Sequence, residues 1–209
     1  MTMRLTISEH TRRPWRIHEL APDFRVEDVW AFRTPGAGPG DFPVMLAALR
    51  AQAGRADSTV VRFLFDVRWK LGALLGWEDP GQGLGGRVES LRDRLPPDLR
   101  QDGAGAPVRS TPFTTVYELP DESATELANG TVHAICHLGW VPTDEGDYQL
   151  RMAALVKPNG LQGRLYMAAI QPFRHLIVYP ALTRRWESAW AERDSSPGGL
   201  ARGLKRQRP

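Results

Sequence analysis

The sequence lacks several features that would place it in large classes of protein. Among its 209 residues there is a single cysteine, Cys136, which excludes an internal disulfide and a structural zinc site built on thiolates. No run approaches the ~18 apolar residues of a membrane span, and four arginines within the first 16 residues interrupt the apolar core that a signal peptide needs. We therefore expect a cytoplasmic protein of bacterial type with no transmembrane segment.

Phosphate and metal sites also lack their usual residues. The glycine-rich stretch at 78–87 has no lysine-serine pair after it and no apolar strand before it, so we interpret it as a flexible insert and not as a phosphate loop. His133 and His137 share one face of an expected strand but lie about 13 Å apart at ~3.3 Å per residue, which is too far to bind one metal ion. We expect no metal and no cofactor.

The positive charge of the chain is concentrated at its C-terminal end. The whole chain carries a formal net charge of +3, whereas residues 193–209 carry five basic residues against Asp194 and hence +4. The remaining residues therefore sum to −1, which argues against nucleic-acid binding by the folded body. We predict a disordered basic tail at 193–209, and weak contact with RNA or an anionic surface is the alternative.

The composition indicates one folded domain. Apolar residues make up 42% of the chain and there are seven tryptophans, enough to build a substantial core. We assign residues 1–14 to an N-terminal lead-in and residues 15–192 to a single domain that contains the glycine-rich insert.

Local patterns in the N-terminal half predict short elements. Alternation over residues 15–20 predicts a first strand, and Asp23 is a candidate N-cap for a helix over Val26–Phe32. Three glycines and two prolines make residues 33–40 a loop. Further helices are predicted from Asp41 or Pro43, over Thr59–Trp77 after Ser58, and over Val88–Leu95.

From Phe113 the apolar residues alternate, which predicts an antiparallel sheet with a tight hairpin at Asn129-Gly130. If Trp140 pairs with Tyr148, one face of this sheet becomes continuously apolar. The opposite face, with two histidines and Arg151, is expected to be mixed and wet. The predicted strands cover residues 113–119, 122–129, 131–141 and 148–156.

The C-terminal part changes to helical spacing. Apolar residues recur at every third or fourth position from Pro172 to Trp190. We favour a helix over most of 161–192, bent at Pro172, at Pro180 or at both. Residues 165–169 fit a helix or a last strand equally well, and both interpretations remain open.

Two C-terminal segments, Lys157–Tyr166 and Pro172–His175, resemble those of a bacterial family of unknown function, whose members occur alone or fused behind a reductase-like nucleotide-binding domain. The order of elements is similar to that of the START-like superfamily, which includes polyketide cyclases and aromatases, lipid-transfer domains and plant ligand-binding proteins. The resemblance is good over 113–190 and thin over 33–110. It implies an α+β helix-grip fold, in which a curved antiparallel sheet wraps around a long C-terminal helix.

The resemblance also implies a ligand pocket between the sheet and this helix, lined by apolar and aromatic groups. Arg151 and Arg164 are expected near its mouth, where either could meet a ligand oxygen or form a surface salt bridge. The candidate lining residues are Tyr117, Cys136, Leu138, Trp140, Tyr148, Leu150, Met152, Tyr166, Phe173 and Leu176.

These observations favour a protein that binds a hydrophobic small molecule or lipid. The alternative is a cyclase, aromatase or dehydratase that acts on a polyketide-like substrate in the same pocket. Such an enzyme would need a general acid or base, for which the candidates are His133, His137, His175 and Tyr117. A third possibility is an interaction module that uses the basic tail and the tryptophan-rich C-terminal helix.

Overall fold

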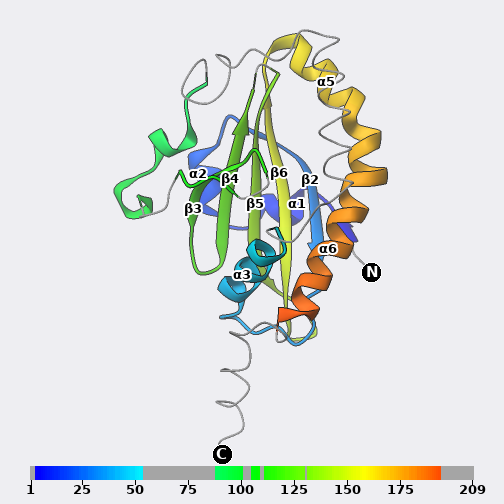
Figure 1. Cartoon of the computed structure of the whole chain (residues 1–209). Coiled ribbons are helices and arrows are strands. Elements are labelled where there is room, and N and C mark those ends of the chain that lie inside the picture. The colour runs from blue at the N-terminus through cyan, green and yellow to red at the C-terminus, as the bar shows by residue number, and fades with distance from the viewer. Residues whose placement is uncertain (1–2, 54–87, 101–104, 109–110, 130, 194–209) are drawn as a thin grey trace, which may run out of the picture.

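A computed structural model describes residues 3–53, 88–100, 105–108, 111–129 and 131–193 (Figure 1). Within these residues, six antiparallel strands form one curved open sheet in the order β1-β2-β6-β5-β4-β3. The α+β class predicted from the sequence is confirmed. The strands are β1 (Met3–Leu5), β2 (Arg25–Phe32), β3 (Thr114–Glu118), β4 (Glu122–Ala128), β5 (Val132–Pro142) and β6 (Tyr148–Pro158).

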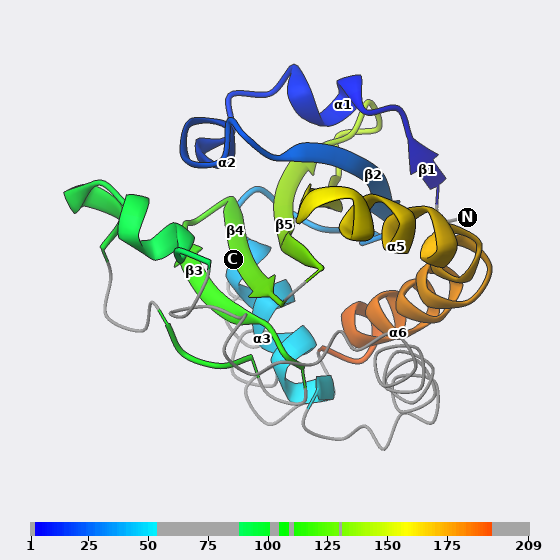
Figure 2. The same cartoon turned by 90° about the horizontal axis from the view of Figure 1, so that it is seen from above.

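Helices flank both faces of the sheet. Figure 2 shows α1 and α2 over one face, which we call the N-terminal face, and α3 and α6 along the other, which we call the helix-side face. The helical elements are α1 (Ser8–Thr11), α2 (Arg16–Leu20), α3 (Phe42–Ala53), η2 (Leu91–Arg94), η3 (Pro97–Leu99), α5 (Gly160–Phe173), η4 (Arg174–Val178) and α6 (Tyr179–Ala191).

Two predictions for the N-terminal segment were wrong. Residues 15–20 contain helix α2 and no strand, because Ile17 and Leu20, three residues apart, are the positions buried against the sheet. Residues 26–32 form strand β2 and no helix. This strand is paired on both sides and covered on both faces, so its apolar residues follow neither simple period. The expected lead-in at 1–14 carries β1, which pairs with β2, and α1.

The β5–β6 hairpin forms as predicted, but its register is shifted by two residues. Trp140 lies opposite Leu150, and Tyr148 lies opposite Pro142. The strands therefore extend further, and a turn containing Gly146 at φ +89° closes the hairpin. Because side chains alternate with a period of two, a shift of two residues changes every partner and leaves every residue on its predicted face.

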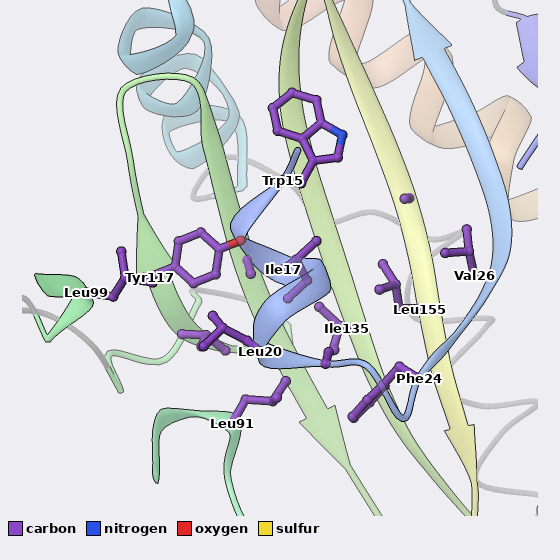
Figure 3. Packing of buried hydrophobic residues seen from close by; sticks show 14 of the residues in the cluster. Trp15, Ile17, Leu20, Phe24, Val26, Leu91, Leu99, Tyr117, Ile135 and Leu155 are labelled. Atoms are coloured by element: carbon purple, nitrogen blue, oxygen red, sulfur yellow. The ribbon is translucent and has the colours of Figure 1, made fainter. Parts of the chain in front are cut away.

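The N-terminal face is a core and not the wet surface that we predicted. Figure 3 shows Ile17 and Leu20 of α2 packed with Ile135 and Leu155 of the sheet. Helix α2 and the η2–η3 segment cover this face, so its apolar positions are removed from water. Its histidines are buried as well, since each pairs with a carboxylate.

The helix-side face holds a second core near the β5–β6 turn. Phe42 and Met45 of α3 and Trp190 of α6 pack there on the sheet. The helix predicted to begin at Asp41 or Pro43 is therefore confirmed, with its apolar residues against the sheet. The sheet residues of this cluster are Phe32, Leu138, Trp140, Leu150 and Met152.

The C-terminal helix is confirmed over residues 160–191, so residues 165–169 are helical and form no strand. It arcs around one side of the sheet in Figure 1. Pro172 lies inside α5 and Pro180 at the start of α6, and the helix widens between them to the π-helical turn η4. Each proline removes one backbone donor from the hydrogen-bond ladder, which favours a local change of pitch.

Several predicted segments lie outside the described residues: the helix over Thr59–Trp77, the insert at 78–87, and nearly all of the tail at 193–209. Of the helix predicted over Val88–Leu95, the structure shows only the short turn η2. Among the helices of the described part, none is both long enough and apolar enough to cross a membrane.

Candidate functional site

The middle of the helix-side face carries a row of small, accessible side chains. Thr125 of β4, Cys136 of β5 and Ala154 of β6 lie opposite one another in register. Each is only partly buried, whereas the larger side chains nearer the β5–β6 turn are buried under α3 and α6. Leu127 and Ala134, the next pair along, are partly buried too. We call these five residues the floor.

The thiol at the centre of the floor is weakly acidic. Cys136 remains partly accessible, yet burial raises the pKa of its thiol to about 12. At neutral pH this thiol is protonated and is therefore not a nucleophile.

A buried carboxylate lies at the β2 end of the row Thr125–Cys136–Ala154. Asp28 of β2 lies opposite Ala154 and is 3% exposed. Its oxygens accept hydrogen bonds from Arg4 (3.2 Å), His175 Nε2 (3.0 Å) and the Tyr179 hydroxyl (2.9 Å), and Arg174 forms a further ion pair with it. We call Asp28 and these four partners the Asp28 cluster. Since two arginines meet one carboxylate, the cluster keeps a positive excess.

The π-helical turn η4 brings three residues of the C-terminal helix to the Asp28 carboxylate, namely Arg174, His175 and Tyr179. In a regular α-helix, residues five apart point about 140° away from each other. A π-helical turn is wider and joins residues five apart by its hydrogen bonds, so Arg174 and Tyr179 fall on nearly the same side of the C-terminal helix. Arg174 donates to the Tyr179 hydroxyl at 2.9 Å, and both reach Asp28. The wider turn therefore places the side chains of Arg174 and Tyr179 around Asp28.

The protonation of this cluster follows from its geometry. A carboxylate can only accept, so His175 donates through Nε2–H and, when neutral, presents an unprotonated Nδ1. The side chain of His175 is 24% exposed, so its ring lies at the accessible edge of the cluster. Burial, and next the Asp28 carboxylate, raise the pKa of Tyr179 against the opposing effect of Arg174, so its hydroxyl remains a donor.

A second polar cluster lies on the N-terminal face. His137 Nε2 lies 2.8 Å from Glu122 Oε2, which also accepts from the Tyr117 hydroxyl at 3.0 Å. His137 Nδ1 lies 3.0 Å from His10 Nε2, and the backbone N–H of Arg16 donates to Glu122 Oε1. Burial alone would raise the pKa of Glu122, but the hydrogen bonds from His137, Arg16 and Tyr117 outweigh it and lower this pKa.

Glu126 and His133 form a third cluster further along the same two strands. His133 Nε2 lies 2.8 Å from Glu126 Oε2, and the backbone N–H of Leu91 donates to the same oxygen at 3.0 Å. The Ser90 hydroxyl donates to the other oxygen. Glu126 is completely buried, so this cluster attaches η2 to the sheet and offers nothing to a ligand.

The structure brings together only part of the predicted site. Cys136 lies in the floor, and Leu138, Trp140, Leu150 and Met152 lie on the same face under α3 and α6, with Tyr148 beside them. Tyr117, His133, His137 and Arg151 lie on the N-terminal face, where Arg151 pairs with Glu9 at 3.0 Å. Arg164, Phe173 and Leu176 are exposed on the C-terminal helix, and the side chain of Tyr166 lies outside the described part.

Sequence analysis identified His175 and missed its partners. Asp28 and its neighbour Glu27 are the two acids in the run Val26–Phe32, whose other residues are apolar, and that was the available signal, because an acid on a strand covered on both faces needs a partner. Glu122, Glu126 and His10 were also missed. Within the described residues, no three His, Cys, Asp or Glu side chains are placed to hold a metal ion.

Comparison with known proteins gives a family and no function. A family model described as "Protein of unknown function (DUF2867)" matches residues 20–181. No curated protein matches the chain, and no solved structure does. The matched region contains the floor and all of the Asp28 cluster except Arg4.

Proposed function

The chain belongs to this family of proteins of unknown function, and we propose that it binds a hydrophobic small molecule or lipid over the floor of its helix-side face. The observation that carries the proposal is the row Thr125–Cys136–Ala154, which stays accessible in the middle of an otherwise buried sheet face. Small side chains there leave room for a ligand, and most of them are apolar.

We further propose that the fold is of the START-like, helix-grip kind. A curved antiparallel sheet with a long C-terminal helix along one face supports this assignment. In such an arrangement the ligand would lie between the sheet and the helical layer, which is where the floor lies.

The position of the Asp28 cluster predicts how the ligand is oriented on the floor. An apolar body over Ala134, Cys136 and Ala154 would bring a polar end group to Arg174 and His175, at the end of the same row. Arg174 can donate to a ligand oxygen, and His175 Nδ1 can accept from a hydroxyl. We therefore expect an amphipathic ligand with one oxygen-bearing end.

The test is to add bulk to the floor. Ala154→Leu adds bulk to the floor, and Ala168→Leu, at an exposed position of α5, is the matched control. We expect wild type and A168L to bind a fluorescent fatty acid, and A154L to bind it at least about tenfold more weakly while remaining folded by circular dichroism. Equal binding by all three proteins, or no binding by wild type, would contradict the proposal.

One observation favours the enzymatic alternative. His175 is oriented by Asp28 and lies at the accessible edge of the cluster, which is the arrangement of a general base held by a carboxylate. We expect His175→Gln to retain the fatty-acid probe. If the protein is a cyclase, aromatase or dehydratase, wild type alone will convert a polyketide-like substrate with loss of water, as measured by mass spectrometry.

A further inference from the structure

We propose a second binding site, for an organic cation, in a cleft at the β5–β6 turn end of the sheet. The cleft has a volume of about 440 Å³, within the range of pockets for small molecules. It lies between the α1–α2 connection, the loop before α3 and the adjoining ends of β4, β5 and β6. This site is separate from the floor and does not depend on the proposed function.

Three aromatic side chains line the cleft, and two of them are held in fixed orientations. Trp140 donates its indole N–H to the carbonyl of Gly38 at 2.9 Å. The ring of Trp15 lies against Gly139, where a Cβ would stand only 2.8 Å from the ring carbons. Tyr148 stacks beside Trp140, with ring centroids 6.4 Å apart and planes inclined by 22°. Trp15 and Trp140 are buried, so Tyr148 is the ring of these three that stays partly accessible, and the packed tryptophans hold it in place before a ligand arrives.

The charged groups of the cleft sum to one negative charge. Glu122 is buried and held as a carboxylate by its three hydrogen bonds, and Asp121 is exposed. The Asp121 carboxylate makes no hydrogen bond or ion pair within the described part of the chain. Arg13 supplies the single positive charge. His137, behind Glu122, adds none, because burial lowers its pKa more than Glu122 raises it.

Aromatic faces and carboxylates together select a cation. The negative face of an aromatic ring attracts an ammonium group, and the attraction grows where water is excluded. An anion would be repelled by Asp121 and Glu122, and a neutral apolar molecule would gain nothing from either carboxylate. We therefore infer a ligand with an alkylated ammonium group placed against the ring of Tyr148.

The test compares choline with 3,3-dimethyl-1-butanol, which has nearly the same shape and no charge. Binding to the full-length protein is measured by titration calorimetry, and we expect choline to bind about tenfold or more tightly than the alcohol. Asp121→Asn should weaken choline several-fold and leave the alcohol unchanged. Arg13→Gln should tighten choline, since it removes a like charge from the cleft.

Asp93→Asn, at an exposed position of η2, provides the matched change of charge away from the cleft and should leave choline binding at its wild-type value. Tyr148→Leu should weaken choline and its uncharged analogue to different extents, because only choline loses a cation–aromatic contact. Equal binding of the two probes would show that shape alone is recognised. That result, the absence of choline binding, or equal effects of D121N and D93N would each overturn the proposal.

Discussion

His137 donates its Nε2–H to Glu122 across strands β5 and β4, and this one hydrogen bond fixes the protons of the residues behind it. With Nε2 protonated, the neutral His137 ring can only accept at Nδ1, so His10 must donate through Nε2–H. His10 Nδ1 is then an acceptor, and it is buried without a hydrogen-bond partner in the described part of the chain. The chain of bonds runs in one direction, from His10 to the carboxylate.

This chain predicts a loss of stability in acid. Burial, and next the neighbouring His137, lower the pKa of His10 from 6.5 to about 2. The unfolded state therefore binds a proton below pH 6.5 that the folded state does not bind until about pH 2, so the free energy of unfolding falls as the pH falls through this window. We expect His10 to contribute up to about 1.4 kcal/mol per pH unit there.

The measurement is urea unfolding at pH 7.5, 6 and 5 for wild type and for His10→Gln, whose amide retains a donor for His137. The variant should lose stability less steeply with falling pH than wild type does. Parallel curves would show that His10 is protonated in the folded protein and would contradict the pKa that the burial implies.

Removing Asp28 should destabilise the fold strongly. Asp28→Ala leaves Arg174, His175 and Tyr179 around an empty acceptor position, and loss of one partner from a buried ionic cluster costs about 3–5 kcal/mol. Glu27→Gln, at the adjacent bulged position of β2, removes a contact with the exposed Arg25 and a weaker electrostatic interaction with Arg174, and should cost less than about 1 kcal/mol. Chemical denaturation of both variants separates the cluster from a general effect of charge on β2.

Gly139→Ala should disturb the packing of Trp15. A Cβ at Gly139 would stand 2.8 Å from two carbons of the indole ring, so the ring must move, at a cost of about 1–3 kcal/mol. Gly40→Ala, where an added Cβ meets nothing within 4 Å, is the control. Thermal unfolding should show a lower midpoint for G139A alone, and the additional change Trp15→Leu should reduce that difference. A G139A protein as stable as G40A would mean that the ring yields freely.

The thiol of Cys136 should react slowly although reagents can reach it. With its pKa raised to about 12, its thiolate fraction at pH 8 is about a thousandfold below that of an unperturbed cysteine. Alkylation by iodoacetamide, followed by mass spectrometry, should be slow in the folded protein and fast in urea. If the fatty-acid probe occupies the floor, it should slow the reaction further, and an unchanged rate would argue against ligand contact with Cys136.

Much of the sheet could be predicted from the sequence, because residues 113–156 alternate and one hairpin is marked by Asn129-Gly130. In the structure Asn129 Oδ1 accepts from the backbone N–H groups of Thr131 and Val132, as a tight turn requires. Strand β2 was missed because both of its faces are covered, so alternation disappears. The register error had a local cause, since the length of the β5–β6 turn was overestimated by two residues at its N-terminal end, where Pro142 still belongs to β5 and pairs with Tyr148.

The site was harder to predict because its residues are distant in sequence. Asp28 meets His175 across 147 positions, and no periodic pattern links them. The buried carboxylate–histidine pairs were easier to predict, because the two members of each pair lie within 15 positions of each other in sequence. Once the Asn129-Gly130 hairpin is drawn, Glu126 and His133 fall on one face two strand positions apart, and the mixed face could have been recognised as paired and covered.

The π-helical turn η4 also sets the rotation of everything that follows it. Such a turn uses one residue more than an α-helix needs for the same rotation about the helix axis, so the C-terminal helix contains one surplus residue between Arg174 and Val178. Deleting one residue there would let the helix relax to regular pitch and leave α6 facing the sheet, whereas one further residue, with no second wide turn to absorb it, would rotate α6 by about 100°. Trp190, now buried on the sheet, would then turn toward solvent, so this short stretch tolerates a deletion far better than an insertion.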